Sequence, residues 1–494
     1  MVDTLIVGGG TAGCVLAARL SEAPDHTVRL LEAGTVWSTA AEMPAALRDA
    51  TRLPIGPEAR WLWRYPATLA ASSDDDRAVE GNLVRGRVIG GSSTVNGSYF
   101  VRAPAADFAA WSAALGGARD WSFESVLPAY RRLEDDRDYG DRPGHGRGGP
   151  IPVRRTTDPT PVSRAFATAA RDAGFAEVPD LNTLPDLNAL PDAGPAEGVG
   201  PVPCNVDGGA RVGTASAYLL PALARPNLSV QGGVLVSRIR FHGDRAIGVD
   251  YRRGETSGTI RADRIVLCAG AVESAALLLR SGIGPPDELA ALGIPVVRPA
   301  PVGAGFDDHP EIGLEYLLDV PTPAAVPLEY VLTLDDIEIR PYTVPFALDR
   351  HRLGVALMRP ESAGLLRLRG ADPLAAPRIE HRYLAGAADR ARLRDAVALA
   401  VEVLHRIPGA YPCHSPPASG HDAWLRANLS TSQHLSGTCR MGAAEHAVVD
   451  TRCAVHGVSG LSVVDLSVVP VPLSRGPQAT TVMLAEHAAG WLTS

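Results

Sequence analysis

The sequence contains no lysine, since every one of its 47 basic residues is an arginine. A catalytic lysine, whether as a Schiff-base amine or as a general base, is therefore excluded. Cysteine is also sparse, and its six residues show no C-x-x-C spacing: Cys14, Cys204, Cys268, Cys413, Cys439 and Cys453. This pattern predicts reduced thiols and argues against a disulfide framework, a zinc site or another metal site.

Long apolar runs and a positive net charge are missing as well. No uninterrupted apolar run reaches the roughly 20 residues of a membrane-spanning helix, and the formal net charge is −8. An acidic chain lacks the electrostatic footprint of a nucleic-acid-binding protein, so that class is excluded. The first expected strand begins at residue 3, which leaves no room for a signal peptide and predicts a cytoplasmic protein.

The chain does have length, and at 494 residues it is too long for one small core. We therefore expect two lobes. Residues 37–70 lack clear periodicity and carry several prolines, which predicts a loop-rich excursion. Residues 294–405 alternate apolar and polar positions, which predicts a second lobe on a mostly antiparallel sheet. A helix at 389–404 is expected on that lobe.

The first 34 residues carry the strongest local pattern. An apolar run at 4–7 is typical of a buried parallel strand, and Gly8, Gly10 and Gly13 follow it at G-x-G-x-x-G spacing. These glycines permit a tight turn, a close approach of the backbone to a pyrophosphate, and close packing of the next helix, expected at 12–21. The N-terminus of that helix would direct free N–H groups at phosphates.

An acidic residue, Glu32, ends a second expected strand at 27–31 and lies nineteen residues after Gly13. A carboxylate at this spacing accepts the hydroxyls of an adenosine ribose and disfavours a 2′-phosphate, and therefore NADP. The stretch by itself does not separate NAD from FAD. The structural alternative is a glycine turn in an ordinary βαβ unit.

Elements typical of the nucleotide-binding lobe return late in the chain. They are strands at 228–231, 235–241, 246–252, 259–262, 264–268 and 461–464, and helices at 272–281 and 480–492. The nucleotide-binding domain is therefore expected to be discontinuous.

Two further stretches carry candidate chemistry. The run from Gly86 to Phe100 combines paired glycines with small hydroxylated residues. This composition suits a backbone that lies flush against a flat ligand, but an ordinary turn before a helix explains it equally well. His434 begins the run HLSGTCRMG near the C-terminus; taken alone, such a histidine is more often structural than catalytic.

Taken together, these stretches make the chain resemble the glucose–methanol–choline (GMC) oxidoreductases, from residue 3 to about 492. The runs 86–100 and 270–284 resemble the two family patterns, and 302–309 resembles a turn of the family. The second pattern departs only at Ala275, where the family prefers proline or serine. Asp307 stands where the turn usually has glutamine.

The resemblance implies an α/β protein. Its Rossmann-like FAD-binding domain is accompanied by a second α+β substrate domain built on a mostly antiparallel sheet. The FAD-binding parts would be residues 1–150, 205–293 and 431–494, and the substrate parts would be residues 151–204 and 294–430.

The resemblance also implies FAD as the cofactor. The residues that would bind it are Gly8, Gly10, Thr11, Ala12, Gly13, Glu32, Ala33, Arg87, Gly90, Gly91, Ser92, Asn96, Gly97, Val236, Ala269, Asp465, Gln478, Ala479 and Thr480. Some members attach the flavin through a histidine immediately before the asparagine, and here that position is Val95. FAD is therefore expected to be bound non-covalently.

The reaction implied by the resemblance is the oxidation of a CH–OH group, in which a base takes the hydroxyl proton while the α-carbon passes a hydride to flavin N5. His434 matches the family's base, and an imidazole titrates near neutrality. The family pairs this histidine with a second histidine or an asparagine, but this chain has Gly476 there. Arg475, Gln478 or a water is left to supply the missing hydrogen bond.

Of these three, we name Arg475 as the second catalytic candidate. His309 and His487 are expected to be structural.

A narrower likeness, to the mycofactocin-associated GMC branch, is carried by residues 149–155, 337–342 and 474–477. It implies reduced mycofactocin as the hydride donor, electron transfer toward the respiratory chain, and a peripheral contact with the inner face of the membrane as an open option. Two alternatives stay open. One is a dehydrogenase or oxidase of a small primary alcohol such as choline, and the other is a flavin-binding protein without alcohol oxidation.

Overall fold

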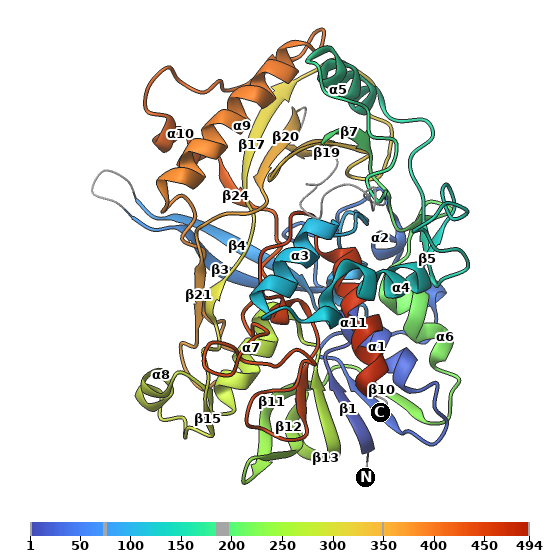
Figure 1. The fold of residues 1–494 in the computed structure, drawn as a ribbon, viewed down its shortest axis with the longest axis vertical. Coiled ribbons are helices and arrows are strands. Elements are labelled where there is room, and N and C mark those ends of the chain that lie inside the picture. The colour runs from blue at the N-terminus through green and yellow to red at the C-terminus, as the bar shows by residue number, and fades with distance from the viewer. Residues whose placement is uncertain (1, 73–76, 184–196, 348–349, 493–494) are drawn as a thin grey trace.

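The computed structural model describes residues 2–72, 77–183, 197–347 and 350–492. Figure 1 shows two large sheets at opposite ends of the molecule, with a smaller sheet and several helices between them. Both termini lie at the end that carries β1. The predicted α/β fold with a second, antiparallel lobe is confirmed; the residue ranges of the two domains stay a prediction.

The first large sheet has the strand order β10-β2-β1-β13-β12-β11, and β25 also pairs with β13. Its strands are β1 (Val2–Val7), β2 (Val28–Leu31), β10 (Leu228–Gln231), β11 (Leu235–His242), β12 (Arg245–Arg253), β13 (Thr256–Leu267) and β25 (Leu461–Val463). The central pairs are parallel, whereas β11–β12 and β12–β13 are antiparallel. The sheet therefore draws on three separate parts of the chain, as expected. The runs at 259–262 and 264–268 form one strand, because Asp263, the single residue between them, lies inside the continuous pairing with β1.

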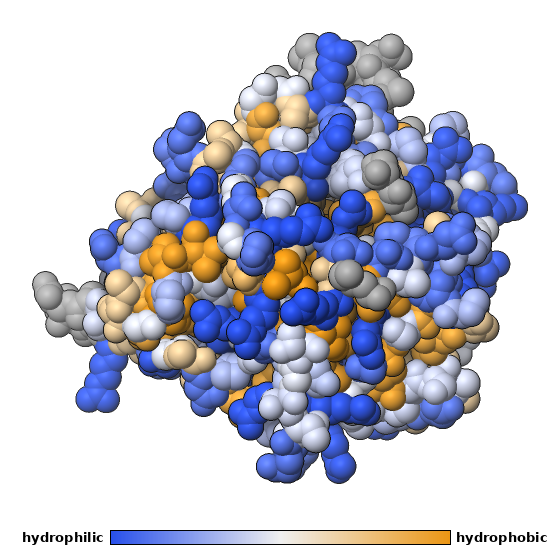
Figure 2. All heavy atoms as spheres, turned by 90° about the horizontal axis from the view of Figure 1, so that it is seen from below, coloured by the Kyte–Doolittle hydropathy of each residue, from blue (hydrophilic) through white to orange (hydrophobic). Residues whose placement is uncertain are grey.

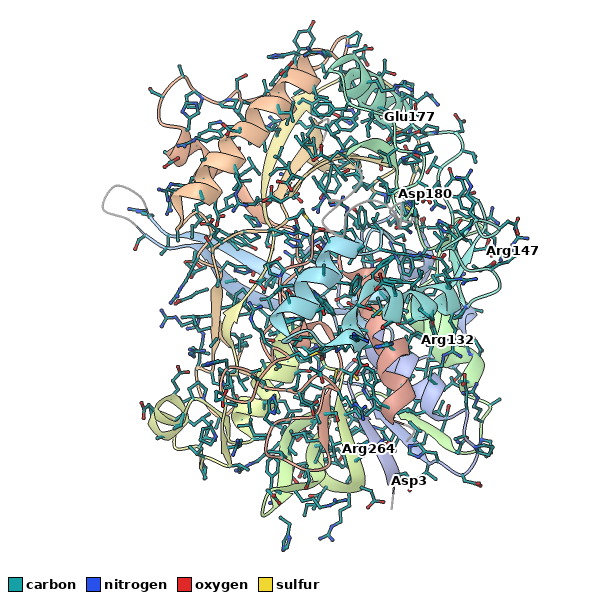
Figure 3. All side chains as sticks on the ribbon, in the orientation of Figure 1. Asp3, Arg132, Arg147, Glu177, Asp180 and Arg264 are labelled. Atoms are coloured by element: carbon teal, nitrogen blue, oxygen red, sulfur yellow. The ribbon has the colours of Figure 1, made fainter. Side chains whose placement is uncertain are left out.

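Two helices from opposite ends of the chain pack together against this sheet. They are α1 (Thr11–Leu20) and α11 (Gln478–Leu492), and they lie side by side in Figure 1. Arg19 of α1 pairs with the buried Glu486 of α11 at 2.8 Å, and Arg132, labelled in Figure 3, reaches the same carboxylate at 3.0 Å. The ion pairs with Glu486 join α11 to α1 and to α4 (Phe123–Leu133).

The second large sheet has the strand order β23-β17-β20-β19-β18-β7, with β24 also on β17, and all of its pairings are antiparallel. Its strands are β7 (Gly198–Pro201), β17 (Pro310–Leu317), β18 (Tyr330–Leu334), β19 (Ile337–Ala347), β20 (Arg350–Leu357), β23 (Tyr411–Pro412) and β24 (Leu429–Thr431). Helices α5 (Pro161–Asp172) and α9 (Ala387–His405) pack on it and bury a common apolar core.

A third sheet, β16-β21-β22-β3-β4, joins the two lobes. Its strands are β3 (Leu62–Ala70), β4 (Val79–Gly86), β16 (Ala304–Phe306), β21 (Gly364–Arg367) and β22 (Arg378–Glu380). The expectation of a loop-rich excursion over 37–70 is wrong for β3. This strand is stabilised by pairing with β4 and with β22, a segment far along the chain, which local periodicity does not reveal.

Among the described residues, the remaining helices have at most 11 residues, and the remaining strands form two-stranded sheets. They are α2 (Ala45–Arg48), α3 (Ala105–Ala114), α4 (Phe123–Leu133), α6 (Leu220–Ala222), α7 (Gly270–Arg280), α8 (Pro286–Ala291), α10 (His421–Ala427), β5 (Glu134–Asp136), β6 (Ile151–Val153), β8 (Val206–Asp207), β9 (Ala210–Arg211), β14 (Ile283–Gly284) and β15 (Arg298–Pro299). Within the described ranges, every helix falls short of the length and apolar character that a membrane crossing requires. On the face shown in Figure 2, apolar side chains lie in separate groups between hydrophilic ones.

Candidate active site

A cavity of about 510 Å³ lies between the nucleotide-binding loop and the second large sheet. Its wall contains most of the residues that the sequence assigned to the cofactor. These are Gly8, Gly10, Thr11, Ala12, Glu32, Ala33, Gly91, Ser92, Asn96, Gly97, Val236, Ala269, Asp465 and Gln478, together with His434. One continuous space is therefore shared by the expected flavin site and the expected catalytic base.

The glycine loop after β1 leaves room for a ligand because of its backbone geometry. Gly8 has φ of +101°, and a Cβ there would lie 2.5 Å from the carbonyl oxygen of Cys268. A Cβ at Gly13 would overlap the carbonyl oxygen of Gly8, so this position needs glycine for α1 to pack against the loop. The first turn of α1 has no side-chain cap, and its free N–H groups suit the pyrophosphate of FAD.

Glu32 lies at the end of β2 with its carboxylate on the cavity wall. One oxygen accepts a hydrogen bond from the N–H of Gly9 at 2.8 Å, and the other accepts one from Gly34 at 2.7 Å. Burial raises the pKa of Glu32 to about 7, although these two hydrogen bonds oppose the shift. The carboxylate is thus held in place by backbone and keeps lone pairs for the ribose hydroxyls.

Asp465 joins the loop after β25 to the N-terminus of α7. Its carboxylate accepts hydrogen bonds from the Ser274 hydroxyl at 2.6 Å and from the N–H groups of Gly270 at 2.9 Å and Ser467 at 2.8 Å. Burial raises the pKa of Asp465. The side chain lines the cavity and orders the backbone of two neighbouring segments there.

Gln478, the first residue of α11, gives an independent test of whether FAD fits. Its side-chain Nε2 is buried and has no hydrogen-bond partner among the described residues, and the residue lines the cavity. A buried amide donor without a partner is costly unless a ligand accepts from it. The carbonyl groups of a flavin ring are acceptors of the required kind, so the residues present fit FAD.

Five of the assigned cofactor residues lie outside the cavity wall. Gly90 has φ of +84°, and a Cβ there would overlap the Thr94 hydroxyl. Arg87 stacks on Trp63, with the guanidinium carbon 4.2 Å from the ring centre. Gly13, Ala479 and Thr480 pack in the interior, where the Thr480 hydroxyl is 2.8 Å from the hydroxyl of Tyr130. These five residues therefore do not line the cavity; they pack beneath the segments that line it.

His434 lies between β24 and the cavity, and its main-chain N–H donates to Asp308 at 2.8 Å. Its ring Nδ1 is 2.8 Å from Nδ1 of His309, and the two rings meet edge to face. Burial holds the pKa of His434 well below its usual range, and the nearby Arg340 lowers it further. A neutral imidazole in a dry pocket can accept a proton from a substrate hydroxyl.

The place opposite His434, where the family has a second side chain, is filled by Tyr99. A Cβ on Gly476 would lie 2.8 Å from Cδ1 of Tyr99. The Tyr99 hydroxyl donates to Glu338 at 2.8 Å. Arg475 is buried behind this pair and is not on the cavity wall. Its Nη1 donates to the carbonyl of Ser474 at 2.6 Å, and its Nε lies 3.8 Å from Glu338.

Sequence reasoning missed a buried polar wall on the second sheet. Arg340 pairs with Glu338 at 2.7 Å and with Glu311 at 2.8 Å, and the hydroxyls of Tyr342 and Ser432 donate to Glu311. Glu311, Arg340 and Tyr342 line the cavity. The signal was the alternation of polar residues at 338, 340 and 342, which places them on one face of β19.

Comparison with known proteins identifies the family. The family model named GMC oxidoreductase matches residues 2–311 in its N-terminal part and residues 360–485 in its C-terminal part. A GMC-type oxidoreductase in the thcA 5′ region of Rhodococcus erythropolis is 44% identical, over 99% of this chain and 98% of that protein. An oxygen-dependent choline dehydrogenase of Vibrio vulnificus is 33% identical, over 99% and 93%.

Solved structures give the same result. Pyridoxine 4-oxidase from Mesorbium loti superposes with a TM-score of 0.90 at 31% identity, covering 99% of each chain. Formate oxidase superposes with a TM-score of 0.87 at 23% identity, covering 99% of this chain and 97% of that one, a likeness of fold. The chain therefore belongs to the GMC oxidoreductase family and is an FAD-dependent oxidoreductase that acts on CH–OH groups.

Proposed function

We propose that this protein is a dehydrogenase that re-oxidises reduced mycofactocin, with His434 as the base, and passes electrons toward the respiratory chain. The observation that carries the assignment of the base is the position of the His434 ring on the wall of the cavity that also holds the glycine loop and Glu32. The sequence likeness at residues 149–155, 337–342 and 474–477 supports mycofactocin as the substrate.

The residues around the cavity support separate roles for the cofactor, the base and the polar wall. FAD, when bound, supplies the hydride acceptor. His434 takes the hydroxyl proton of the substrate, and Asp308 holds the main chain of this histidine through its N–H. The ion pairs of Arg340 with Glu338 and Glu311 fix the positions of Arg340 and Glu311 on the wall of the same cavity.

A small primary alcohol such as choline is the second candidate, because relatives at 33–35% identity carry that name. The cavity wall does not favour a trimethylammonium group. Its Glu311 carboxylate is already paired with Arg340 at 2.8 Å, and a compensated carboxylate attracts a cation weakly.

Anaerobic mixing of the purified holoenzyme with reduced mycofactocin, choline and pyridoxine tests the proposal. We expect reduced mycofactocin to bleach the flavin absorbance fastest, and His434→Ala to lose at least about 100-fold in that rate. Faster bleaching by choline would assign the second candidate. If no alcohol bleaches the flavin, the protein binds FAD without alcohol oxidation.

Re-oxidation of the bleached enzyme identifies the electron acceptor. We expect slow re-oxidation by O₂ and fast re-oxidation by a quinone-type acceptor, and rapid formation of peroxide would contradict the dehydrogenase assignment. Because a quinone-type acceptor lies in the membrane, we propose that the protein is cytoplasmic and contacts the inner face of the membrane peripherally. Cell fractionation tests this location.

A further inference from the structure

The two ring nitrogens of His434 have different surroundings. Nδ1 is 2.8 Å from Nδ1 of His309, whereas Nε2 has no hydrogen-bond partner among the residues that the structure describes, and the ring lines the cavity. In a hydrogen bond between two imidazole nitrogens, one must carry the proton and the other must accept it. The direction of this one bond therefore decides whether Nε2 of His434 has a free lone pair.

His309 forms the hydrogen bond to Nδ1 of His434, and its own ring is buried and absent from the cavity wall. A base at His434 needs a free lone pair on Nε2, so its single ring proton must lie on Nδ1. Nδ1 of His309 is then the acceptor, and the single proton of the His309 ring lies on Nε2. The backbone of Leu473 raises the pKa of His309 against the lowering by burial, which agrees with this placement of the proton.

A neutral imidazole has one N–H, and burial lowers the pKa of His309, which keeps its ring neutral. With this proton on Nε2, the Nδ1 of His309 is an acceptor, so His434 donates its own Nδ1–H across the 2.8 Å contact. We propose that His309 is a positioning residue that holds His434 in the tautomer whose Nε2 lone pair faces the substrate.

The proposal rests on the proposed function, in which His434 takes the hydroxyl proton. In the other tautomer Nε2 would already carry a proton and could accept none. Once Nε2 is protonated, the hydrogen bond from Nδ1–H to His309 stabilises the resulting imidazolium, as a partner of a catalytic histidine does elsewhere. Gly476 offers no side chain for this purpose, and the Tyr99 hydroxyl is committed to Glu338 at 2.8 Å.

The other charged groups that act on the ring of His434 are Arg340, Arg85 and Asp308. Arg340 and Arg85 lower the pKa of His434, while Asp308 raises it. None of them bonds to the ring nitrogens among the described residues, so they affect the charge of the ring but leave the choice of tautomer to His309.

The first test reads the tautomer without turnover. The holoenzyme is labelled with ¹⁵N-histidine, and the His434 signals are assigned by their loss in His434→Ala. We expect Nδ1 of His434 to be protonated and Nε2 to be unprotonated at pH 7.5 in the unaltered protein. A protonated Nε2 would overturn the proposal, whether or not any alcohol is oxidised.

The second test uses two variants of similar size. His309→Asn keeps an amide oxygen close to the position of Nδ1, and His309→Leu removes the acceptor. We expect the leucine variant to lose about 10-fold or more in the rate of flavin reduction, with KM little changed and FAD content retained. The asparagine variant is expected to remain within about threefold of the unaltered rate. Equal rates for all three proteins, or equal losses in both variants, would overturn the proposal.

A pH series and a matched control complete this design. Because the pKa of His434 is lowered, the rate should fall only as the pH drops below 6.5. The acid limb of the leucine variant should lie at lower pH than that of the unaltered enzyme, since the imidazolium of His434 loses its acceptor. An undisplaced limb would contradict the proposal. His351→Leu, a buried histidine stacked on Tyr316 away from the cavity, should leave the profile unchanged. If the unaltered enzyme reduces its flavin with no alcohol, the proposed function fails and the labelling test still decides the tautomer.

Discussion

The position of Glu32 could be predicted from the sequence, but its charge state could not. Its spacing from the glycines predicted a ribose-binding carboxylate, and the structure places it on the cavity wall between two backbone N–H donors. The rise of its pKa to about 7 follows from burial, which only the folded chain provides. At the scale of the residue, the sequence predicts which group is present, and the fold sets its ionisation.

Replacing Glu32 by glutamine is expected to weaken FAD binding about 10-fold or more. The amide has one acceptor where the carboxylate has two, so its NH₂ must face one of the two N–H donors, and a charged hydrogen bond is worth about 1.5–3 kcal/mol. Titration of the apoprotein with FAD measures the effect. The surface variant Glu22→Gln serves as the control, and equal affinities in both variants would contradict the role of Glu32.

Replacing Gly476 by asparagine, a residue that the family has at this position, is expected to destabilise the protein by about 1–3 kcal/mol, because the new side chain overlaps the Tyr99 ring. The distance of 2.8 Å from the added Cβ to Tyr99 Cδ1 requires that ring to move. Thermal melting of Gly476→Asn, Tyr99→Ala and the double variant measures the overlap as a double-mutant cycle. The asparagine should cost less stability in the Tyr99→Ala protein than in the unaltered one; an equal cost would show that Tyr99 is not the obstacle.

Helix α1 and its preceding loop show what a secondary-structure element contributes. The sequence placed the helix at 12–21, and the structure has it at Thr11–Leu20. Close packing requires Gly13, whose Cβ would overlap the Gly8 carbonyl. The expected helix near 480–492 begins two residues earlier, at Gln478, and this brings the Gln478 amide to the cavity. An exact helix start depends on its cap and its tertiary neighbours, which local periodicity does not contain.

Gly13→Ala is expected to abolish FAD retention and lower the melting temperature, because the methyl group forces α1 away from the loop. The matched control is Gly490→Ala on α11, where no described atom outside the neighbouring helix backbone lies within 4 Å of the added Cβ. Alanine there should be neutral or stabilising by about 1 kcal/mol, since glycine is a poor helix former. Flavin content and melting temperature of both variants are the measurements. Normal flavin content in Gly13→Ala would contradict the packing argument.

The whole molecule is tied together by contacts between distant segments. The third sheet joins β3 and β4 to β22 and β21, and a buried ion cluster near Asp180 (Figure 3) joins several loops. The cluster consists of Arg102, Glu134, Asp136, His145, Arg155 and Asp180. Although Glu134, Asp136 and His145 have metal-ligand geometry, the two arginines and the charged His145 already balance the three carboxylates of the cluster. We therefore interpret the cluster as a buried ion-pair network that holds these loops together.

From this ion-pair network we predict that the free energy of unfolding decreases at alkaline pH. Burial lowers the pKa of His145, but the nearby carboxylates of Asp136, Asp180 and Glu134 outweigh it and raise the pKa to about 10. Because the folded pKa exceeds the unfolded value of 6.5, the stabilisation is complete below pH 6.5 and disappears as the pH rises through about 10.

The expected loss in His145→Gln is about 3 kcal/mol in free energy of unfolding near pH 6, shrinking toward pH 10. Urea denaturation at a series of pH values measures it. His405→Gln, at the exposed end of α9, should change stability by less than about 0.5 kcal/mol at each pH. A constant difference between the unaltered protein and His145→Gln across the series would show that the ring is not charged.

The sequence by itself determined where the nucleotide-binding loop lies, because the strand, glycine turn, helix and acid of a βαβ unit follow one another at fixed spacing in one short stretch. It also marked His434 as a candidate base. Only the tertiary structure decided that His309 contacts His434, that Tyr99 occupies the space beside Gly476, and that Arg475 lies 3.8 Å from Glu338. These contacts join segments far apart in the chain, and their geometry arises only when the two lobes close around one cavity.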